Sequence, residues 1–220
     1  FLPNDVKEHC HLIELPRAIA QAHYPDSADL QDKARVRLAF DELFLLQLGV
    51  LSKKRDWQES QPGTPIKINQ QLLDTFLQSL PFKLTPAQQK VLQEILGDMQ
   101  KPQAMSRLLQ GEVGSGKTVV ATAALLMAVA DGYQTALMAP TEILAEQHFA
   151  TIHKLLSATG NLQEEADHLY TYSGILPKPL TIALLIGATG AKTKRELHKR
   201  SASGEIDIVI GTHALIQQEV

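Results

Sequence analysis

The residue types and spacing at positions 111–118 are those of a loop that wraps around phosphate groups. The run consists of Gly111, Glu112, Val113, Gly114, Ser115, Gly116, Lys117 and Thr118. Its glycines let backbone N–H groups point inward at phosphate oxygens, and a helix that begins near Gly116 would add its positive end. We expect Lys117 to reach the β- and γ-phosphates of ATP, and the Thr118 hydroxyl to ligate the accompanying Mg²⁺. A glycine-rich turn that binds nothing is the alternative, but it leaves unexplained the predicted strand before the loop and the predicted helix after it.

A second group of residues, upstream of the loop, combines an aromatic ring with a side-chain amide. Thr85 followed by Gln88 predicts a capping box, and Pro86 occupies the favoured first position of a helix. This structural role is sufficient to explain the residues. A functional role is also open, in which the Gln88 amide recognises the adenine edge and Phe82 packs against the base.

Two further segments place a threonine directly after a predicted strand, at the start of a helix. One contains Pro140 and Thr141, and the other contains Gly211, Thr212 and His213. Free backbone amides and a hydroxyl at a helix N-terminus suit a phosphate of a nucleic-acid backbone, so we predict DNA contacts at both. Plain helix capping is the more economical interpretation when each segment is taken alone.

Two clusters of polar residues carry weaker signals. His9, Cys10 and His11 are metal-ligand types, but adjacent side chains diverge and no second cluster completes a tetrahedral set, so we predict no metal site there. The segment 192–200 predicts a basic helix, which is either a solvated face or part of the ligand side of the sheet.

The composition bounds the class of protein. A chain of 220 residues with 44% hydrophobic content can bury one good core and a smaller lead-in piece. The formal net charge of -3 gives no overall attraction for nucleic acid, so any DNA contact must come from local clusters. One cysteine excludes an internal disulfide framework and is typical of the cytoplasm. The most apolar stretch, 119–130, is shorter than the ~20 residues that a membrane span needs.

The first part of the chain is expected to be mostly helical. Prolines predict an irregular connector over residues 1–25. A helix is predicted over residues 30–48, with Ser27 or Asp29 as its cap and Gly49 as its end.

Asn69 is expected to cap the last helix of this lead-in region, which we assign to residues 1–80. From residue 81 onward, short apolar runs alternate with amphipathic helices. The expected strands are 105–109, 135–139, 181–186 and 206–210, and the expected helices are 117–130, 142–156 and 193–201. Buried parallel strands joined by helices of crossover length predict a doubly wound α/β domain over residues 81–220.

Taken together, these motifs resemble the superfamily 2 helicases, and RecG-type DNA helicases in particular. The aromatic residue and glutamine before the loop resemble the adenine-recognising Q-motif, and residues 111–118 resemble motif I. Residues 140–145 are similar to motif Ia, and residues 211–215 to the Gly-Thr-His-Ala-Leu stretch that follows it. The helix containing residues 37–43 resembles the segment that leads from the DNA-junction wedge into the motor.

The resemblance implies a P-loop, RecA-like motor domain with a mostly parallel central sheet, preceded by a helical linker. It implies that ATP and Mg²⁺ drive translocation on duplex DNA. The substrates would be branched DNA, namely stalled forks and Holliday junctions, in repair and recombination. A cytoplasmic monomer is expected. In the chemical step, Lys117 and Mg²⁺ on Thr118 would neutralise charge that develops on the γ-phosphate.

Two features depart from the family pattern. The Asp-Glu box, and the second motor domain with its arginine finger, do not occur in the sequence, so we expect this fragment to be inactive by itself. The segment 158–179 is longer than the family's usual link, and no role is predicted for it.

Three alternatives stay open at this stage. A related translocase, such as a transcription-repair coupling factor or a primosomal helicase, would share the motor but not the lead-in helix at 37–43. A nucleotide-gated regulator or transporter ATPase that never touches DNA would have no reason to carry both threonine segments. A degenerate P-loop module used only for protein binding would fail a nucleotide-binding measurement.

Overall fold

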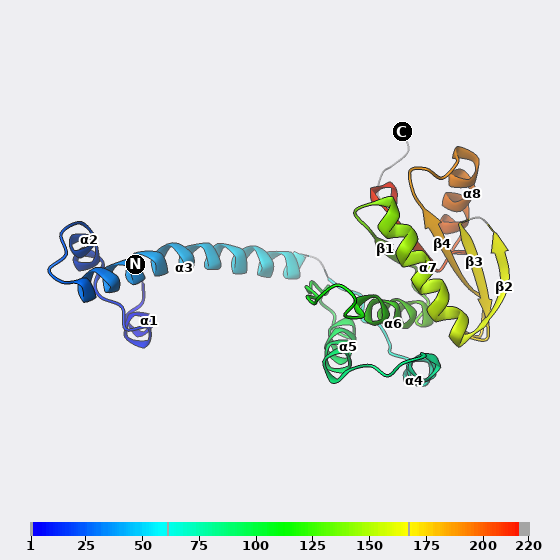
Figure 1. Cartoon of the computed structure of the whole chain (residues 1–220), viewed down its shortest axis with the longest axis horizontal. Helices are drawn as coiled ribbons and strands as arrows, with labels where there is room; N and C mark the ends of the chain where they lie inside the picture. The colour runs from blue at the N-terminus through cyan, green and yellow to red at the C-terminus, as the bar shows by residue number, and fades with distance from the viewer. Residues whose placement is uncertain (1, 61, 167, 216–220) are drawn as a thin grey trace. The chain divides into compact units, whose positions relative to one another are not determined.

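The computed structural model describes residues 2–60, 62–166 and 168–215. The chain forms two compact units, Phe1–Pro62 and Gly63–Val220. The first unit is helical, and the second combines helices with a single sheet (Figure 1).

The first unit contains α1 (Asn4–His9), α2 (Leu15–His23) and α3 (Ala28–Ser60). The predicted irregular connector over residues 1–25 is therefore wrong. Its prolines limit two short helices instead of preventing them: Pro3 is the N-cap of α1, and Pro16 lies in the first turn of α2. A proline there costs little because the first N–H groups of a helix have no intrahelical acceptor.

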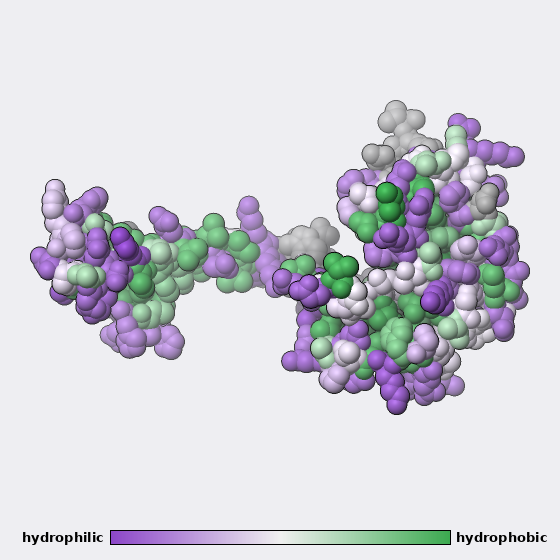
Figure 2. Space-filling view, viewed as in Figure 1, coloured by the Kyte–Doolittle hydropathy of each residue, from purple (hydrophilic) through white to green (hydrophobic). Residues whose placement is uncertain are grey.

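Helix α3 begins as predicted, because the Leu30 N–H donates to Ser27 Oγ at 3.2 Å. Its predicted end at Gly49 is wrong, since the helix is 33 residues long and continues through that glycine. An interior glycine costs a helix roughly 1 kcal/mol relative to alanine, which is too little to end one that has helix-favouring residues on both sides. Apolar side chains are exposed along its second half, as Figure 2 shows; they are Leu43, Leu45, Leu46, Leu48, Val50 and Leu51.

A buried arginine holds α3 to the segment between α1 and α2. Arg37 is 2% exposed, and its Nη1 donates to the Ile13 carbonyl at 2.9 Å while its Nε donates to Asp41 Oδ1 at 3.2 Å. The buried Ala18 and Ala34 let α2 and α3 approach closely. The first unit thus has its own buried contacts, and the buried guanidinium of Arg37 has hydrogen-bond partners within it.

The second unit contains one mixed sheet and five α-helices among its described residues. The helices are α4 (Gln70–Ser79), α5 (Pro86–Met99), α6 (Lys117–Ala130), α7 (Glu142–Thr159) and α8 (Ala191–Ala202). The strands are β1 (Thr135–Met138), β2 (Asn161–Ala166), β3 (Leu169–Ser173), β4 (Leu180–Leu185) and β5 (Ile208–Gly211), followed by the 3₁₀ turn η1 (His213–Leu215).

Helix α4 begins at the predicted cap, because Asn69 Oδ1 accepts from the Leu72 N–H at 3.0 Å. Its buried side chains Leu72, Leu73 and Phe76 belong to the same apolar core as α5, α6, α7 and the sheet. In the structure α4 is consequently part of the second unit, whereas the sequence had placed the boundary after it. The amphipathic pattern of a helix shows that it needs a partner but does not say which one.

The strand order of the sheet is β1-β5-β4-β3-β2. Strand β5 pairs in parallel with both β1 and β4, and Gly211 at its end lies in register with Met138 and Leu185. This parallel centre confirms the predicted α/β fold. The antiparallel strands β3 and β2 extend it and come from the segment 158–179, to which no role had been given.

The predicted strand over residues 105–109 is absent from the part of the chain that the structure describes. This segment has no regular secondary structure and joins no sheet, and Leu108 is 86% exposed. Its apolar pattern is that of a buried strand, but a strand also needs a hydrogen-bonded neighbour, and no described strand pairs with it. The glycine-rich motif therefore follows a segment without regular secondary structure here.

Helix α7 lies across one face of the sheet (Figure 1). Its buried face consists of Ala145, Phe149, Ile152, Leu155 and Leu156. The His153 Nδ1 lies 2.7 Å from the Tyr172 hydroxyl of β3, whose pKa is raised above its ordinary value by burial. Within the described residues, no helix has the length and apolar character needed to cross a membrane.

Candidate functional site

The motif at 111–118 forms a loop that ends directly in a helix, as predicted. Helix α6 begins at Lys117, and its N-cap Gly116 has φ 80° and ψ 25°. Gly114 also has a positive φ of 82°. Both glycines thus adopt the left-handed conformation that strains any residue with a Cβ. No side chain caps α6, so the N–H groups of its first turn face the loop without a side-chain acceptor.

The Lys117 ammonium folds back over this loop. Its Nζ donates to the carbonyl oxygens of Gly111 and Glu112, at 2.8 Å each. The Ser115 N–H donates to the Glu112 carbonyl at 3.1 Å, which tightens the turn. A cation and the positive end of a helix are therefore focused on one small loop, an arrangement that favours a bound anion.

Gln88 touches the loop directly, which the sequence did not predict. The capping box with Thr85 is confirmed: Gln88 Oε1 accepts from the Thr85 N–H at 2.8 Å. Its Nε2 also donates to the Ser115 carbonyl at 2.7 Å, and a Cβ on Gly116 would collide with this amide. Each end of the amide has one partner within the protein, so one N–H and one oxygen lone pair are left for the recognition of adenine, which stays a prediction.

The segment that leads into the loop is anchored on the same helix. Arg107 donates from Nη1 to Glu94 Oε2 at 2.7 Å, and from Nε to Asp98 Oδ2 at 2.9 Å. Hydrogen bonds from Lys101 first, and then from Arg107, hold the pKa of the Asp98 carboxyl below its ordinary value. Helix α5 therefore holds the chain on both sides of the loop. Sequence reasoning missed this, since an arginine in an extended segment gives no signal of its partner.

A cavity of about 1080 Å³ adjoins the loop. It brings Phe82 together with the loop and the first turn of α6, and the packing of Phe82 on a base stays a prediction. The wall on that side includes Phe82, Val113, Gly114, Gly116, Lys117 and Thr118. The sequence did not predict that α7 also lines this cavity, through Leu144, His148, Thr151, Lys154, Leu155 and Ala158. The sequence shows the i, i+4, i+7 spacing of residues along α7. It does not show which part of the chain these residues lie next to.

A divalent cation fits this site through the nucleotide. Thr118 is half-buried in the first turn of α6 and lines the cavity. Within the described ranges, His, Cys, Asp and Glu side chains do not gather in any group of three or more that could hold a metal. The oxygen ligands that the loop can offer to Mg²⁺ are thus the Thr118 hydroxyl and the phosphates bound beside it.

The carboxyl ends of the parallel strands bring the second set of predicted residues together. The Ala139 N–H donates to the Gly211 carbonyl at 2.8 Å, so the segments that follow β1 and β5 start side by side. Thr141 caps α7, with its hydroxyl accepting from the Leu144 N–H at 3.3 Å. Glu142 Oε1 accepts from the Ala188 N–H at 3.2 Å, which ties in the loop after β4.

The residues at this edge differ in how far they reach solvent. Pro140, Thr141 and His213 are exposed, and Thr212 is half-buried. Gly211 is buried within β5, where an added Cβ would collide with the Leu185 carbonyl, so its position is explained by packing. The expected helix after Thr212 is a 3₁₀ turn of three residues among the described ones.

The predicted basic helix is α8, which begins at this same edge after Gly190. Lys192, Arg195 and Lys199 are exposed on it. Arg200 lies 3.2 Å from Glu205 and is thus partly neutralised. The helix adds positive charge beside the strand ends.

Residues 85–220 match the model of the DEAD/DEAH box helicases. The chain belongs to this family of helicases. It is also similar over its whole length to proteins named ATP-dependent DNA helicase RecG: it is 44% identical to the one from Synechocystis sp. and 41% identical to the one from Bacillus subtilis. The solved structure of RecG bound to a three-way DNA junction matches 100% of the chain with a TM-score of 0.78 and 43% identity.

The chain spans only a part of these relatives. It covers 24% of the Synechocystis protein, 29% of the Bacillus protein and 27% of the chain in the solved structure.

Proposed function

We propose that the protein is a RecG-type helicase that couples ATP hydrolysis to translocation on branched DNA. The observation that carries the proposal is the glycine loop at the open start of α6, with the Lys117 ammonium folded over it. This loop lies in a chain that is 44% identical to a RecG protein over 219 residues. Holliday junctions and stalled replication forks are the proposed substrates, in repair and recombination.

ATP is the proposed nucleotide, and its phosphates would lie against the loop and the first turn of α6. Bound ATP supplies the γ-phosphate whose transfer to water drives the motor. Lys117 would exchange its two carbonyl acceptors for phosphate oxygens, and the Thr118 hydroxyl would be a ligand of the accompanying Mg²⁺. Phe82, which lines the same cavity, would pack against the base.

The strand ends are the proposed DNA interface. Pro140, Thr141, Thr212 and His213 would contact the phosphate backbone, with Gly211 keeping the chain in place behind them. These contacts carry no sequence information, so binding should be independent of sequence and should weaken with added salt. We further propose that the protein acts as a monomer in the cytoplasm.

The lead-in unit supports a RecG-type motor over a related translocase. The likeness to RecG proteins covers the whole chain, including residues 1–62, which a shared motor alone would not require. The two threonine segments at one sheet edge likewise favour a motor on DNA over a P-loop ATPase that never binds it.

The test is the ATPase rate of the complete protein with and without DNA. A model fork or four-way junction is expected to raise kcat at least 10-fold above the rate without DNA, and more than linear duplex of the same length does. This stimulation should fall between low and moderate salt, because phosphate contacts release counterions. A rate that is indifferent to every DNA would contradict the proposal and favour the ATPase alternative.

A further inference from the structure

The chain enters the glycine loop, residues 111–118, through a segment without a partner strand. Residues 104–110 have no regular secondary structure and join no sheet in the part of the chain that the structure describes. They therefore lack the backbone ladder that holds a strand in place. Leu109 packs against the apolar core, whereas Leu108 is exposed. The position of this entry segment consequently depends on side-chain contacts, and its polar ones are made by Arg107.

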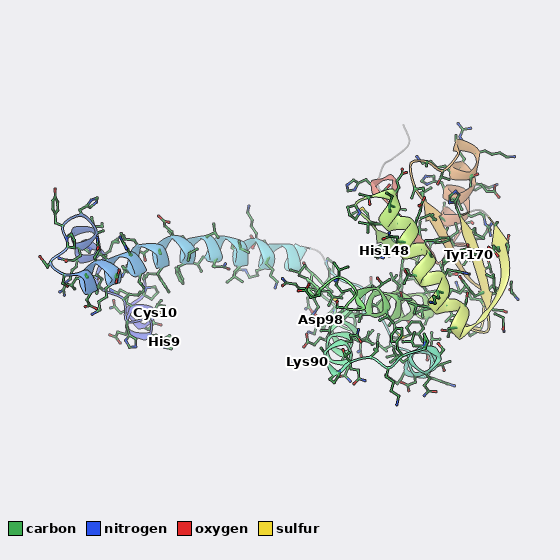
Figure 3. The ribbon with its side chains drawn as sticks, viewed as in Figure 1. His9, Cys10, Lys90, Asp98, His148 and Tyr170 are labelled. Atoms are coloured by element: carbon green, nitrogen blue, oxygen red, sulfur yellow. The ribbon has the colours of Figure 1, made fainter. Side chains whose placement is uncertain are left out.

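The Arg107 guanidinium contacts two carboxylates of helix α5. Its Nη1 donates to Glu94 Oε2 at 2.7 Å, and its Nε donates to Asp98 Oδ2 at 2.9 Å. Glu94 and Asp98 are four residues apart, so they lie on one face of α5, on which Figure 3 labels Asp98. Lys101 Nζ donates to the other Asp98 oxygen at 2.7 Å. Two cations and two carboxylates thus form one balanced network, which fixes the arginine in position and in orientation.

The same helix also holds the loop among its glycines. Gln88 Nε2 donates to the Ser115 carbonyl at 2.7 Å. From Gln88 to Asp98 the helix spans about 15 Å. The loop is therefore attached to α5 at two separated points, Arg107 before the glycines and Ser115 among them. Glycine imposes little conformational preference of its own, so the shape of the loop depends on these attachments.

Helix α5 is itself fixed by packing. Its side chains Leu92, Ile95 and Leu96 are buried in the apolar core that also contains residues of α6. The Arg107 side chain is 32% exposed, and an ion pair at the surface adds little to stability. Arg107 is also not among the described residues that line the cavity beside the loop. Any effect of this arginine on a bound nucleotide must therefore pass through the loop.

We propose that Arg107 is a positioning residue of the nucleotide site. Paired with Glu94 and Asp98, it fixes the entry of the glycine loop on α5, so that the loop amides and Lys117 are arranged for phosphates before the nucleotide arrives. This inference rests on the proposed function, since it assumes that the loop binds ATP. It adds a residue that neither the loop motif nor the glutamine upstream of it identifies.

The first test measures KM and kcat for ATP hydrolysis by the complete protein, with Mg²⁺. Arg107→Gln is expected to raise KM about 5-fold, because part of the binding energy must then order the loop. The change in kcat should stay within about 2-fold, since bound phosphates restore the loop shape at saturating ATP. Arg107→Lys keeps the charge and should recover part of the loss in KM. Arg35→Gln is the matched control and should leave both constants unchanged, because Arg35 is an exposed arginine paired with Asp32 in the first unit.

A double-mutant cycle tests whether the arginine acts through its carboxylate partner. Asp98→Asn alone is expected to raise KM about 3-fold. If the two side chains act as one contact, the double variant should resemble Arg107→Gln, at about 5-fold, and should not reach the product of the two single effects, about 15-fold. Circular dichroism checks that each variant is folded. A product of independent effects would overturn the proposed pairing.

The outcomes separate this inference from the proposed function. If Arg107→Gln is less stable to heat but keeps the KM of the parent, the arginine is structural only and the inference is refuted. The same holds if its KM is unchanged while Lys117→Ala loses turnover, and the proposed function then stands. If Lys117→Ala hydrolyses ATP like the parent, the proposed function itself fails.

Discussion

Helices α6 and α7 both follow an apolar segment, but their first N–H groups are capped differently. Helix α7 begins at Thr141, whose hydroxyl satisfies the Leu144 N–H. Helix α6 begins at Gly116, a residue with no side chain and a left-handed backbone. One helix is capped from within the chain, and the other leaves its first N–H groups for a ligand.

This difference has an energetic meaning. A side-chain cap contributes about 1 kcal/mol to stability, and it reduces what an external anion can add. The open start of α6 forgoes that contribution, and it gains the most when phosphate oxygens accept from its N–H groups. The comparison therefore supports the proposal that the start of α6 binds the nucleotide. For α7 it makes stability the expected main role of Thr141, beside the proposed backbone contacts to DNA.

The largest expected effect comes from Lys117→Ala in the complete protein. The loss of the cation should lower kcat for ATP hydrolysis by at least about 10³-fold, because the Lys117 ammonium stabilises the charge of the transition state by several kcal/mol. Stability should change by less than about 0.5 kcal/mol, since Lys117 bonds only to exposed loop carbonyls. Steady-state rates at saturating ATP and Mg²⁺ measure the first effect. Near-normal turnover would refute the role given to the open helix start.

Gln88→Ala should affect both the capped start of α5 and the glycine loop before α6. It removes half of the α5 capping box, which should cost about 1 kcal/mol in the free energy of unfolding. It also removes the amide that is proposed to recognise the adenine edge, so the ratio of ATP to GTP affinity should fall. Gln93→Ala, at an exposed position on the same helix, is the control. An unchanged ratio would leave Gln88 as a cap only.

The smallest expected effect comes from Thr141→Ala. It should lower stability by about 1 kcal/mol without changing ATP affinity, and Thr141→Ser should recover most of that stability. Affinity for duplex DNA should fall by only a few-fold, because one backbone contact among several is lost. Thermal unfolding and DNA titration measure the two effects. A large loss of ATP binding would show that the two helix starts do not have separate roles.

Local signals explain what the sequence could predict. The caps at Asn69, Thr85 and Thr141, and the turn at Gly116, each depend on residues within a few positions of one another. Such features are encoded by spacing and side-chain chemistry alone. The turn at Gly116 and the helix that starts after it were therefore predictable, whereas phosphate binding by the loop stays a prediction.

Long-range packing explains what the sequence could not predict. The contact between Gln88 and Ser115 spans 27 positions, and α7 reaches the cavity beside the loop only through the fold. The same limit produced the errors: the segment 105–109 has a strand pattern without a described partner, and Gly49 lies in a helix that continues past it. A pattern states what a segment prefers, and tertiary neighbours decide whether it is realised.

Hydrogen exchange of backbone amides, with and without ATP and Mg²⁺, tests the contrast between the two helix starts most directly. Bound phosphates should slow exchange at the amides of Gly114, Gly116, Lys117 and Thr118, for which the described residues offer no hydrogen-bond acceptor. The amides of residues 142–145 should be nearly unchanged, because Thr141 already caps that end. Protection confined to the start of α6 is the predicted result. Absence of protection there, or equal protection at the start of α7, would contradict the account.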